Sequence, residues 1–268
     1  MTLQVSASAC QRTCEPWPIQ RLLEQRVVAL GMALENMTAG AYQLHVNSYL
    51  TFCHAHNFPI DLTPDMLSFF IVYMSTYIKP QSIQTYLSGI MSSLDPYYPD
   101  VCKNRSSALV CHTLTGCTKM RGSAASWKLP FATSDLQMLL SVYGTSADHD
   151  DLLFLLFLAI TFTSFHGLMR LGELVMHDNP GYQSLRKAIK CHSVKFHHNP
   201  QHFVFTLPAH KADRLYEGST IVIEQRNSDI DPLVVFHRYL LSRDRLHPWH
   251  PLLWLLQSGS LPTCMWYI

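Results

Sequence analysis

The chain has 268 residues, which is enough for one large domain or two ordinary ones. Hydrophobic residues make up 48% of it and charged residues only 15%, so a sizeable core is expected. The formal net charge of +1 excludes a globally basic protein. Any attraction for a polyanion must therefore come from local basic patches.

Cysteine usage and the N-terminal residues bear on the cellular compartment. The eight cysteines form no Cys-x-x-Cys pair, and a chain of this length does not need disulfides, so reduced thiols are expected. The N-terminus lacks the apolar core of a secretory signal. These features predict a nuclear or cytoplasmic protein that is not secreted.

The membrane candidate is the apolar run Leu152–Met169. Thr161, His166 and Gly167 interrupt it, and its unbroken apolar part is too short to span a bilayer comfortably. We therefore expect a buried core helix and no membrane partner.

Helical signals dominate the first half of the chain. After a polar start, a helix is expected around Arg21–Glu35, and Thr38 is suited to cap the next one. Thr63-Pro64-Asp65 combines a capping residue, a proline at the first helical position and an acid in the first turn. Pro80-Gln81-Ser82 opens another helix, and a last one is expected over Ser106–Lys119.

The second half begins with helices and continues with strands. Thr133-Ser134-Asp135 caps a helix, and Asp148–Asp151 starts the apolar helix. Asp231-Pro232 opens a helix that runs to about Arg243. Between them, segments rich in Val, Ile, Phe and Thr predict three strands, over Ala188–Phe196, His202–Leu207 and Ser219–Glu224.

These elements predict a mainly α protein with a small antiparallel β-sheet. We expect an N-terminal extension over 1–35, an all-α bundle over 36–120, and a module of helices and strands over 131–268. The segment 121–130 is small, polar and basic and ends in proline, which is typical of a linker.

Two cationic residues stand out by their positions. Arg170 follows a glycine turn after the buried helix, where an arginine is costly unless an anion meets it. Lys211 lies between the second and third expected strands. A rigid guanidinium and a flexible ammonium can together clamp a phosphate. The alternatives are an ion pair of Arg170 with Glu173 and a solvent-exposed hairpin charge at Lys211.

The segment HGLMRLGEL, from His166 to Leu174, resembles the G-L-R-x-G-E-L box of tyrosine recombinases, the integrase-like enzymes that break and rejoin DNA. Met169 is an extra residue in this box. PQSIQTYLSGI, which begins at Pro80, is similar to a helix of the family's core-binding domain. The order of modules also agrees over roughly 36–268. The likeness is greatest to integrase-like proteins of fungi that are related to mobile elements.

This resemblance implies a helical SAM-like core-binding domain followed by a partial integrase-like α+β catalytic domain. It implies duplex DNA as the partner, a possible homo-oligomer on DNA, no metal and no small-molecule cofactor. In intact members a tyrosine attacks the scissile phosphate and fixed cations stabilise the developing charge. By this likeness Arg170 is the first catalytic arginine, Lys211 is the hairpin lysine that protonates the leaving oxygen, and Glu173 supports the arginine box.

The chain departs from the family after the sheet. A second box, H-x-x-R, is expected there, with the nucleophilic tyrosine beyond it. His247-Pro248-Trp249-His250 has no arginine at the fourth place, and Tyr267 precedes any such box. We therefore expect a truncated catalytic domain that cleaves no DNA strand by itself. We also expect apolar surface to be left without cover near Leu252–Leu256.

Two groups of residues are candidates for DNA contacts. Lysine, hydroxyl and ring side chains near the start of the helix at Pro80 suit contacts with phosphates, namely Lys79, Ser82, Thr85 and Tyr86. Basic residues flank the last helix of the bundle and the linker, namely Lys103, Arg105, Lys119, Arg121 and Lys128. The alternative for both groups is an ordinary solvent-exposed surface.

A histidine-rich segment near Cys191 raises the question of zinc. It contains His192, His197, His198 and His202, but no paired spacing matches a structural zinc site. The sequence favours a histidine-rich strand edge, and no metal is expected.

The sequence as a whole predicts a DNA-binding protein that resembles an integrase and belongs to DNA recombination or DNA integration. The alternative is a non-catalytic structural or interaction protein that has inherited the fold.

Overall fold

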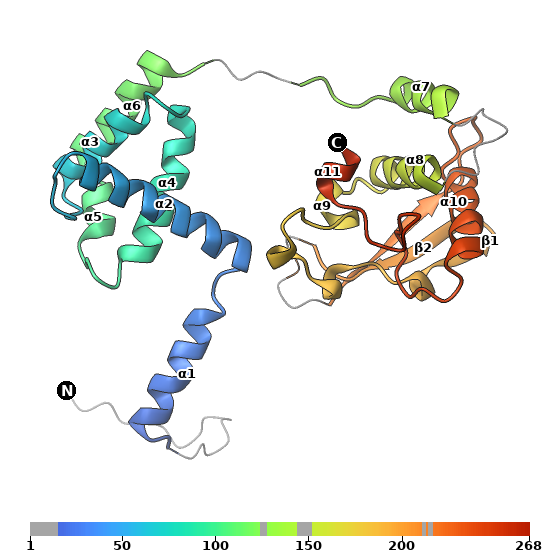
Figure 1. The fold of residues 1–268 in the computed structure, drawn as a ribbon, viewed down its shortest axis with the longest axis horizontal. Helices are drawn as coiled ribbons and strands as arrows, with labels where there is room; N and C mark the ends of the chain where they lie inside the picture. Colours follow the sequence, from blue (N-terminus) through green and yellow to red (C-terminus); the bar gives the residue numbers. More distant parts are fainter. Residues whose placement is uncertain (1–15, 124–127, 144–151, 211–212, 214–216) are drawn as a thin grey trace, which may run out of the picture. The chain divides into compact units, whose positions relative to one another are not determined.

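The computed structural model describes residues 16–123, 128–143, 152–210, 213 and 217–268. Contacts divide the chain into two compact units, Met1–Ser126 and Trp127–Ile268 (Figure 1). The described residues are mainly helical with a three-stranded antiparallel sheet, which confirms the predicted fold class at this level. None of their helices is long and apolar enough to cross a membrane.

The first unit is helical. Its elements are α1 (Ile19–Gly31), α2 (Asn36–Ala55), α3 (Pro64–Met74), α4 (Pro80–Leu94), α5 (Val101–Arg105) and α6 (Ala108–Arg121). No side chain of α1 is buried. The core lies among the other helices, where Tyr49 of α2 meets Phe70 of α3 edge to face with ring centroids 5.3 Å apart.

Capping explains where the helices of this unit begin. Thr63 caps α3, because its side-chain oxygen accepts a hydrogen bond of 3.3 Å from the N–H of Met66. The prediction for Thr38 is wrong, since α2 begins at Asn36 and Thr38 lies within its first turn. The helix predicted over Ser106–Lys119 is confirmed as α6, with each end two residues later, whereas the short helix α5 before it was not predicted. Ser107 is extended and caps a new helix, α6, so α5 stays separate.

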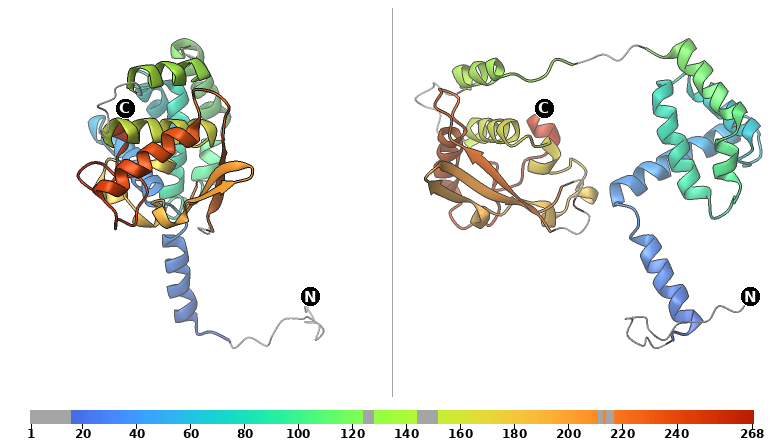
Figure 2. Two further views of the ribbon diagram at one scale, coloured as in Figure 1. Left: turned by 90° about the vertical axis from the view of Figure 1, so that its right-hand side faces the viewer. Right: turned by 180° about the vertical axis from the view of Figure 1, so that it is seen from behind.

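The second unit packs helices against one face of the sheet (Figures 1 and 2). Its helices are α7 (Thr133–Tyr143), α8 (Leu152–His166), α9 (Leu171–Leu174), α10 (Pro232–Leu246) and α11 (Cys264–Tyr267), with 3-10 turns η1 (Pro180–Tyr182), η2 (Leu185–Lys187) and η3 (Cys191–Ser193). The strands are β1 (Lys195–His198), β2 (Gln201–Leu207) and β3 (Ser219–Glu224), in the order β1-β2-β3. Asp231 caps α10 by accepting a bond of 3.0 Å from the N–H of Leu233.

The sheet has a buried face and a solvent face. Along β2, Phe203, Phe205 and Leu207 are buried, whereas the residues between them are partly or fully exposed. Phe203 stacks on Phe236 of α10 with ring centroids 4.1 Å apart. The helices therefore cover one side of the sheet, and the even-numbered positions of β2 face solvent.

The first strand differs from the prediction. A strand was expected over Ala188–Phe196, but β1 begins only at Lys195 and is preceded by η3. The earlier backbone groups pair elsewhere, since Leu253 N–H donates to Ile189 O (2.9 Å) and Cys191 N–H donates to Pro251 O (2.9 Å). The backbone groups of Ile189 and Cys191 are thus bonded to the segment after α10, and they do not extend β1 along β2.

The predicted uncovered surface near Leu252–Leu256 is also wrong. Leu252, Leu253, Trp254 and Leu255 are all buried. Tyr239 holds this segment against α10, because its hydroxyl donates to Leu253 O (2.8 Å) and accepts from Leu255 N–H (2.9 Å). The predicted start of the apolar helix at Asp148–Asp151 lies outside the described residues.

Candidate functional site

The exposed face of α4 carries only uncharged polar side chains. Ile83, Leu87, Ile90 and Met91 are buried on its other face, as the 3.6-residue period requires. Gln81, Ser82, Gln84 and Thr85 are exposed, and no residue of α4 is charged. Hydroxyls and amides without a neighbouring carboxylate can donate hydrogen bonds to an anionic surface without repelling it.

Basic groups lie at the start of this α4 face. Lys79 is exposed at the N-cap of α4, and Pro80 occupies the first turn. Arg121, at the end of α6, donates to Val72 O (3.3 Å) and to the hydroxyl of Ser75, at the end of α3. A Cβ built on Gly122 would lie 3.5 Å from the side-chain nitrogen of Gln81, so the end of α6 lies beside the start of α4.

Arg105 lies along the flank of the α4 face. Its Nη2 donates to Ser88 Oγ (3.1 Å) and more weakly to Gln84 O (3.5 Å). A guanidinium has five N–H donors, so these two bonds fix its orientation and leave others for an outside acceptor. The structure therefore brings Lys79, Arg105 and Arg121, which are far apart in the sequence, to the edges of one polar helix face.

The remaining candidates of the first unit are placed differently. Tyr86 points toward α2, where its ring packs on His45 with centroids 4.3 Å apart. Lys103 is exposed on α5, and Lys119 is exposed on α6. Lys128 is exposed in the second unit, beyond the boundary between the units. No described contact joins these three lysines to α4.

The arginine box forms a tight turn between α8 and α9. Leu168 adopts a left-handed conformation with φ of 51°, and its side chain is 93% exposed. A leucine there is strained, because Cβ crowds the backbone in this region. The strained residue is therefore Leu168, and not the glycine beside it.

Arg170 lies at the surface and is paired with Glu173. Arg170 N–H donates to Glu173 Oε2 (2.9 Å), and the guanidinium Nη1 lies 3.4 Å from Oε1. The side chain of Arg170 is 72% exposed, whereas that of Glu173 is 15% exposed. The expected ion pair is present and holds the turn. An exposed pair of this kind contributes little free energy, so the guanidinium can still bind an external anion.

His166 lies one turn before Arg170 in the sequence, at the end of α8. Its Nε2 is buried without a hydrogen-bond partner among the described residues. Burial lowers the pKa of His166, and the positive charge of Arg226 lowers it further. The imidazole is therefore neutral at neutral pH and adds no charge beside the arginine box.

Lys211 lies outside the described residues, in the connection between β2 and β3. In the same connection, the carboxylate of Asp213 accepts hydrogen bonds from the backbone N–H groups of Glu217 (3.2 Å) and Gly218 (2.9 Å). Gly218 has φ of 78°, a conformation that glycine adopts without strain.

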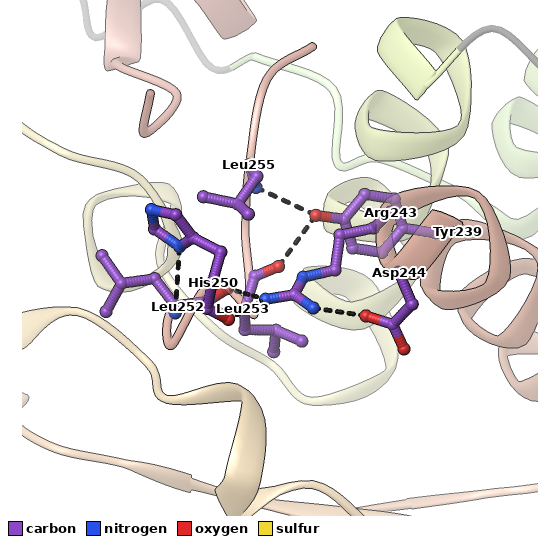
Figure 3. A network of polar contacts seen from close by, with 7 residues as sticks. All are labelled: Tyr239, Arg243, Asp244, His250, Leu252, Leu253 and Leu255. Carbon is purple, nitrogen blue, oxygen red and sulfur yellow. Dashed lines mark hydrogen bonds and ion pairs between the residues drawn. The ribbon is translucent and has the colours of Figure 1, made fainter. Parts of the chain in front are cut away.

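The sequence reasoning missed a buried arginine, Arg243 of α10 (Figure 3). Its side chain is 1% exposed, and its Nη2 donates to the carbonyl oxygens of His250 and Leu252, the latter at 2.7 Å. Nη1 pairs with the partly exposed carboxylate of Asp244. The helical spacing could have predicted this burial, because Arg243 follows Tyr239 by four residues and therefore lies on the apolar face of α10. Arg243 is a structural residue that anchors the segment after α10.

The comparisons with known proteins do not assign a family. No protein-family model matches the chain, and no curated protein shows significant similarity to it.

Proposed function

We propose that the chain binds duplex DNA through the exposed face of α4 and its basic edges. In this proposal the first unit is a SAM-like core-binding bundle, and the second unit is a partial integrase-like α+β domain. The proposed class of protein is the tyrosine-recombinase-like proteins of DNA recombination and integration. A homo-oligomer on DNA agrees with this proposal.

The observation that carries the proposal is the composition of the α4 face. It combines exposed hydroxyls and amides, at Ser82, Thr85 and Gln81, with cations at its edges. Most protein–DNA hydrogen bonds go to the phosphate backbone and come from such groups. The same helix carries the sequence PQSIQTYLSGI that resembles the core-binding domain.

The second unit supports the proposal through Arg170. Its guanidinium is exposed and oriented by Glu173, which suits an arginine that meets a phosphate. In the proposal Arg170 and Lys211 are the cations of the second unit that contact the DNA backbone, and Glu173 positions Arg170. Strand cleavage is not part of the proposal.

The test is a fluorescence-anisotropy titration of a labelled DNA duplex with the full chain at several salt concentrations. The three cations at the edges of the α4 face and the two of the second unit make five proposed phosphate contacts. They predict a slope of log K against log salt of about −4.5. Ser82→Glu and Thr85→Glu add a carboxylate to the α4 face and are expected to weaken binding about tenfold each. Absence of binding at low salt would refute the proposal.

Thr51→Glu is the matched control for these variants. Thr51 is also an exposed helical residue of the first unit, but it lies on the side of α2 that faces away from the buried residues. The added charge is the same, so general repulsion of DNA is equal in all three variants. Equal loss of affinity in Thr51→Glu and Thr85→Glu would exclude α4 as the contact surface.

The second candidate is a non-catalytic interaction protein that has inherited the fold. The observation that favours it is the internal use of the arginines, because Arg105, Arg121 and Arg170 each bond to a residue of their own unit. This candidate predicts no salt-dependent affinity for DNA and no effect of Arg170→Ala on any DNA binding. The same titration therefore separates the two functions.

A further inference from the structure

Three side chains that can ligate metals form a row across the solvent face of the sheet. His197 of β1 is the register partner of His202 of β2, and His202 is the register partner of Glu224 of β3. Partners in antiparallel strands project from the same face. Their neighbours in sequence, such as Phe203, form the buried face, so the row lies on the exposed side.

The two imidazoles of the row are close together. The ring centroids of His197 and His202 are 4.6 Å apart, and the ring planes differ by 7°. No described residue hydrogen-bonds to the ring of His197. His197 is exposed and His202 is half-buried, so both imidazoles can be reached by a ligand from the solvent face of the sheet.

A hydrogen bond sets the tautomer of His202. Its Nδ1 lies 2.7 Å from the carbonyl oxygen of Pro200. A carbonyl oxygen can only accept, so Nδ1 carries the proton and Nε2 keeps its lone pair. Metal-ligating histidines usually donate their other ring N–H to a carbonyl or carboxylate in this way, which orients the ring.

The charges around the row favour a divalent cation over an anion at its centre. Glu224 places a carboxylate on the far side of His202. Lys195 shares this face two residues before His197, which is about 7 Å along an extended strand. A flexible lysine at that distance can turn away into solvent, whereas the histidine pair and the carboxylate lie in adjacent register positions.

We propose that His197 and His202 form a surface site for a first-row transition-metal ion such as Zn²⁺. The ion is bound by the two imidazole nitrogens and by water, with the carboxylate of Glu224 nearby as a compensating charge. Imidazole suits Zn²⁺, Ni²⁺ and Cu²⁺ better than it suits Mg²⁺ or Ca²⁺. The site is independent of the proposed DNA binding.

The geometry defines what kind of site this is. Among the described residues, no three or more His, Cys, Asp or Glu side chains are grouped to hold a metal ion. Because the two rings are parallel, the ring of His197 must turn about its side-chain bonds to face the same ion, while the hydrogen bond to Pro200 holds the ring of His202. Two protein ligands with open positions make an exchangeable site, unlike the closed four-ligand sites that stabilise small domains.

The first experiment is a calorimetric titration of the full chain with ZnCl₂ in a non-chelating buffer. The test variants are His197→Ala and His202→Ala. The control is His198→Ala, because His198 follows His197 on β1 and therefore projects from the opposite face. Other cysteines and histidines can bind Zn²⁺ in all variants alike, so the difference between variants is the measurement.

We expect the wild type and His198→Ala to bind Zn²⁺ equally. Each of the other variants is expected to lose one site, or to bind it at least about tenfold more weakly. Equal binding by all variants, or no binding by the wild type, overturns the proposal. Circular dichroism confirms that these exposed substitutions leave the fold intact.

A second experiment locates the ion without a substitution. Diethyl pyrocarbonate acylates accessible neutral imidazoles, and mass spectrometry of the peptides identifies the modified histidines. Zn²⁺ is expected to protect His197 and His202 together and to leave His198 reactive. Equal reactivity of the histidine pair with and without Zn²⁺ overturns the proposal, even if other residues of the chain bind the ion.

Discussion

Two helical glycines of the first unit predict opposite effects of the same substitution. Gly89 lies in α4 where this helix crosses α2. A Cβ built there would lie 2.3 Å from Nδ1 of His45 and 3.0 Å from Cδ1 of Tyr42. Gly116 lies in α6, and a Cβ built there meets nothing within 4 Å. We therefore expect Gly89→Ala to destabilise the protein and Gly116→Ala to stabilise it.

The magnitudes follow from two opposing contributions. Alanine is more favourable than glycine in a helix interior by about 1 kcal/mol, which applies to both sites. At Gly89 the ring of His45 must move by more than 1 Å to restore an ordinary contact, and His45 is buried and packed on Tyr86. Overpacking of this kind costs about 1–3 kcal/mol. The net expectation is a loss of about 0–2 kcal/mol for Gly89→Ala and a gain of about 0.5–1 kcal/mol for Gly116→Ala.

The assay is urea and thermal unfolding of the full chain, followed by far-UV circular dichroism. Both glycines belong to the first unit, so the same transition reports on both variants. One kcal/mol shifts Tm by about 4–8 °C in a domain of this size. A rise in Tm for Gly89→Ala, equal to that of Gly116→Ala, would refute the close crossing of α2 and α4. The double variant His45→Ala/Gly89→Ala is expected to recover part of the steric cost.

Three further predictions concern single residues. Arg243→Met leaves the carbonyl oxygens of His250 and Leu252 without their buried donor. Urea unfolding is therefore expected to show a loss of about 2–4 kcal/mol in the free energy of unfolding. An unchanged midpoint would contradict the anchoring role. Leu168→Gly removes the strain of φ at 51° and is expected to raise stability by about 1 kcal/mol in the same assay, whereas a loss would show that the turn is not strained. Burial lowers the pKa of His45 in the folded protein, so below about pH 6.5 the unfolded chain binds a proton that the folded chain excludes. Stability is therefore expected to fall as pH decreases through this range. In unfolding curves measured from pH 8 to 5, His45→Gln is expected to reduce this pH dependence of stability. An identical pH dependence in the variant would assign the effect to other groups.

Local signals in the sequence predicted several elements well. The starts of α3 and α10 follow from Thr63-Pro64 and Asp231-Pro232, because a capping side chain and a proline act within one turn of the chain. β3 agrees with the prediction at both ends, since its composition and flanking turn residues are local properties as well. The first strand was misplaced because its backbone pairs with a segment about sixty residues later in the chain.

The candidate sites show the same contrast between local signals in the sequence and contacts that only the fold creates. Local sequence patterns identified residues of suitable chemistry, such as the uncharged polar surface of α4, Arg170 with its partner Glu173, and the histidines near Cys191. Which of these residues come into contact depends on the tertiary fold. It placed Arg105 beside Ser88, turned Tyr86 onto His45, and set His202 between His197 and Glu224.

The physical reason is the range of the interactions involved. A cap, a helix period or a turn depends on residues a few positions apart, so the sequence contains the whole interaction. The burial of Arg243 and the register of the three strands depend on long-range packing, which brings carbonyl groups and side chains from distant segments into contact. Spacing along the chain therefore identified His197 and His202 as metal-binding residue types but did not show that they are partners, because their proximity is set by the pairing of β1 with β2.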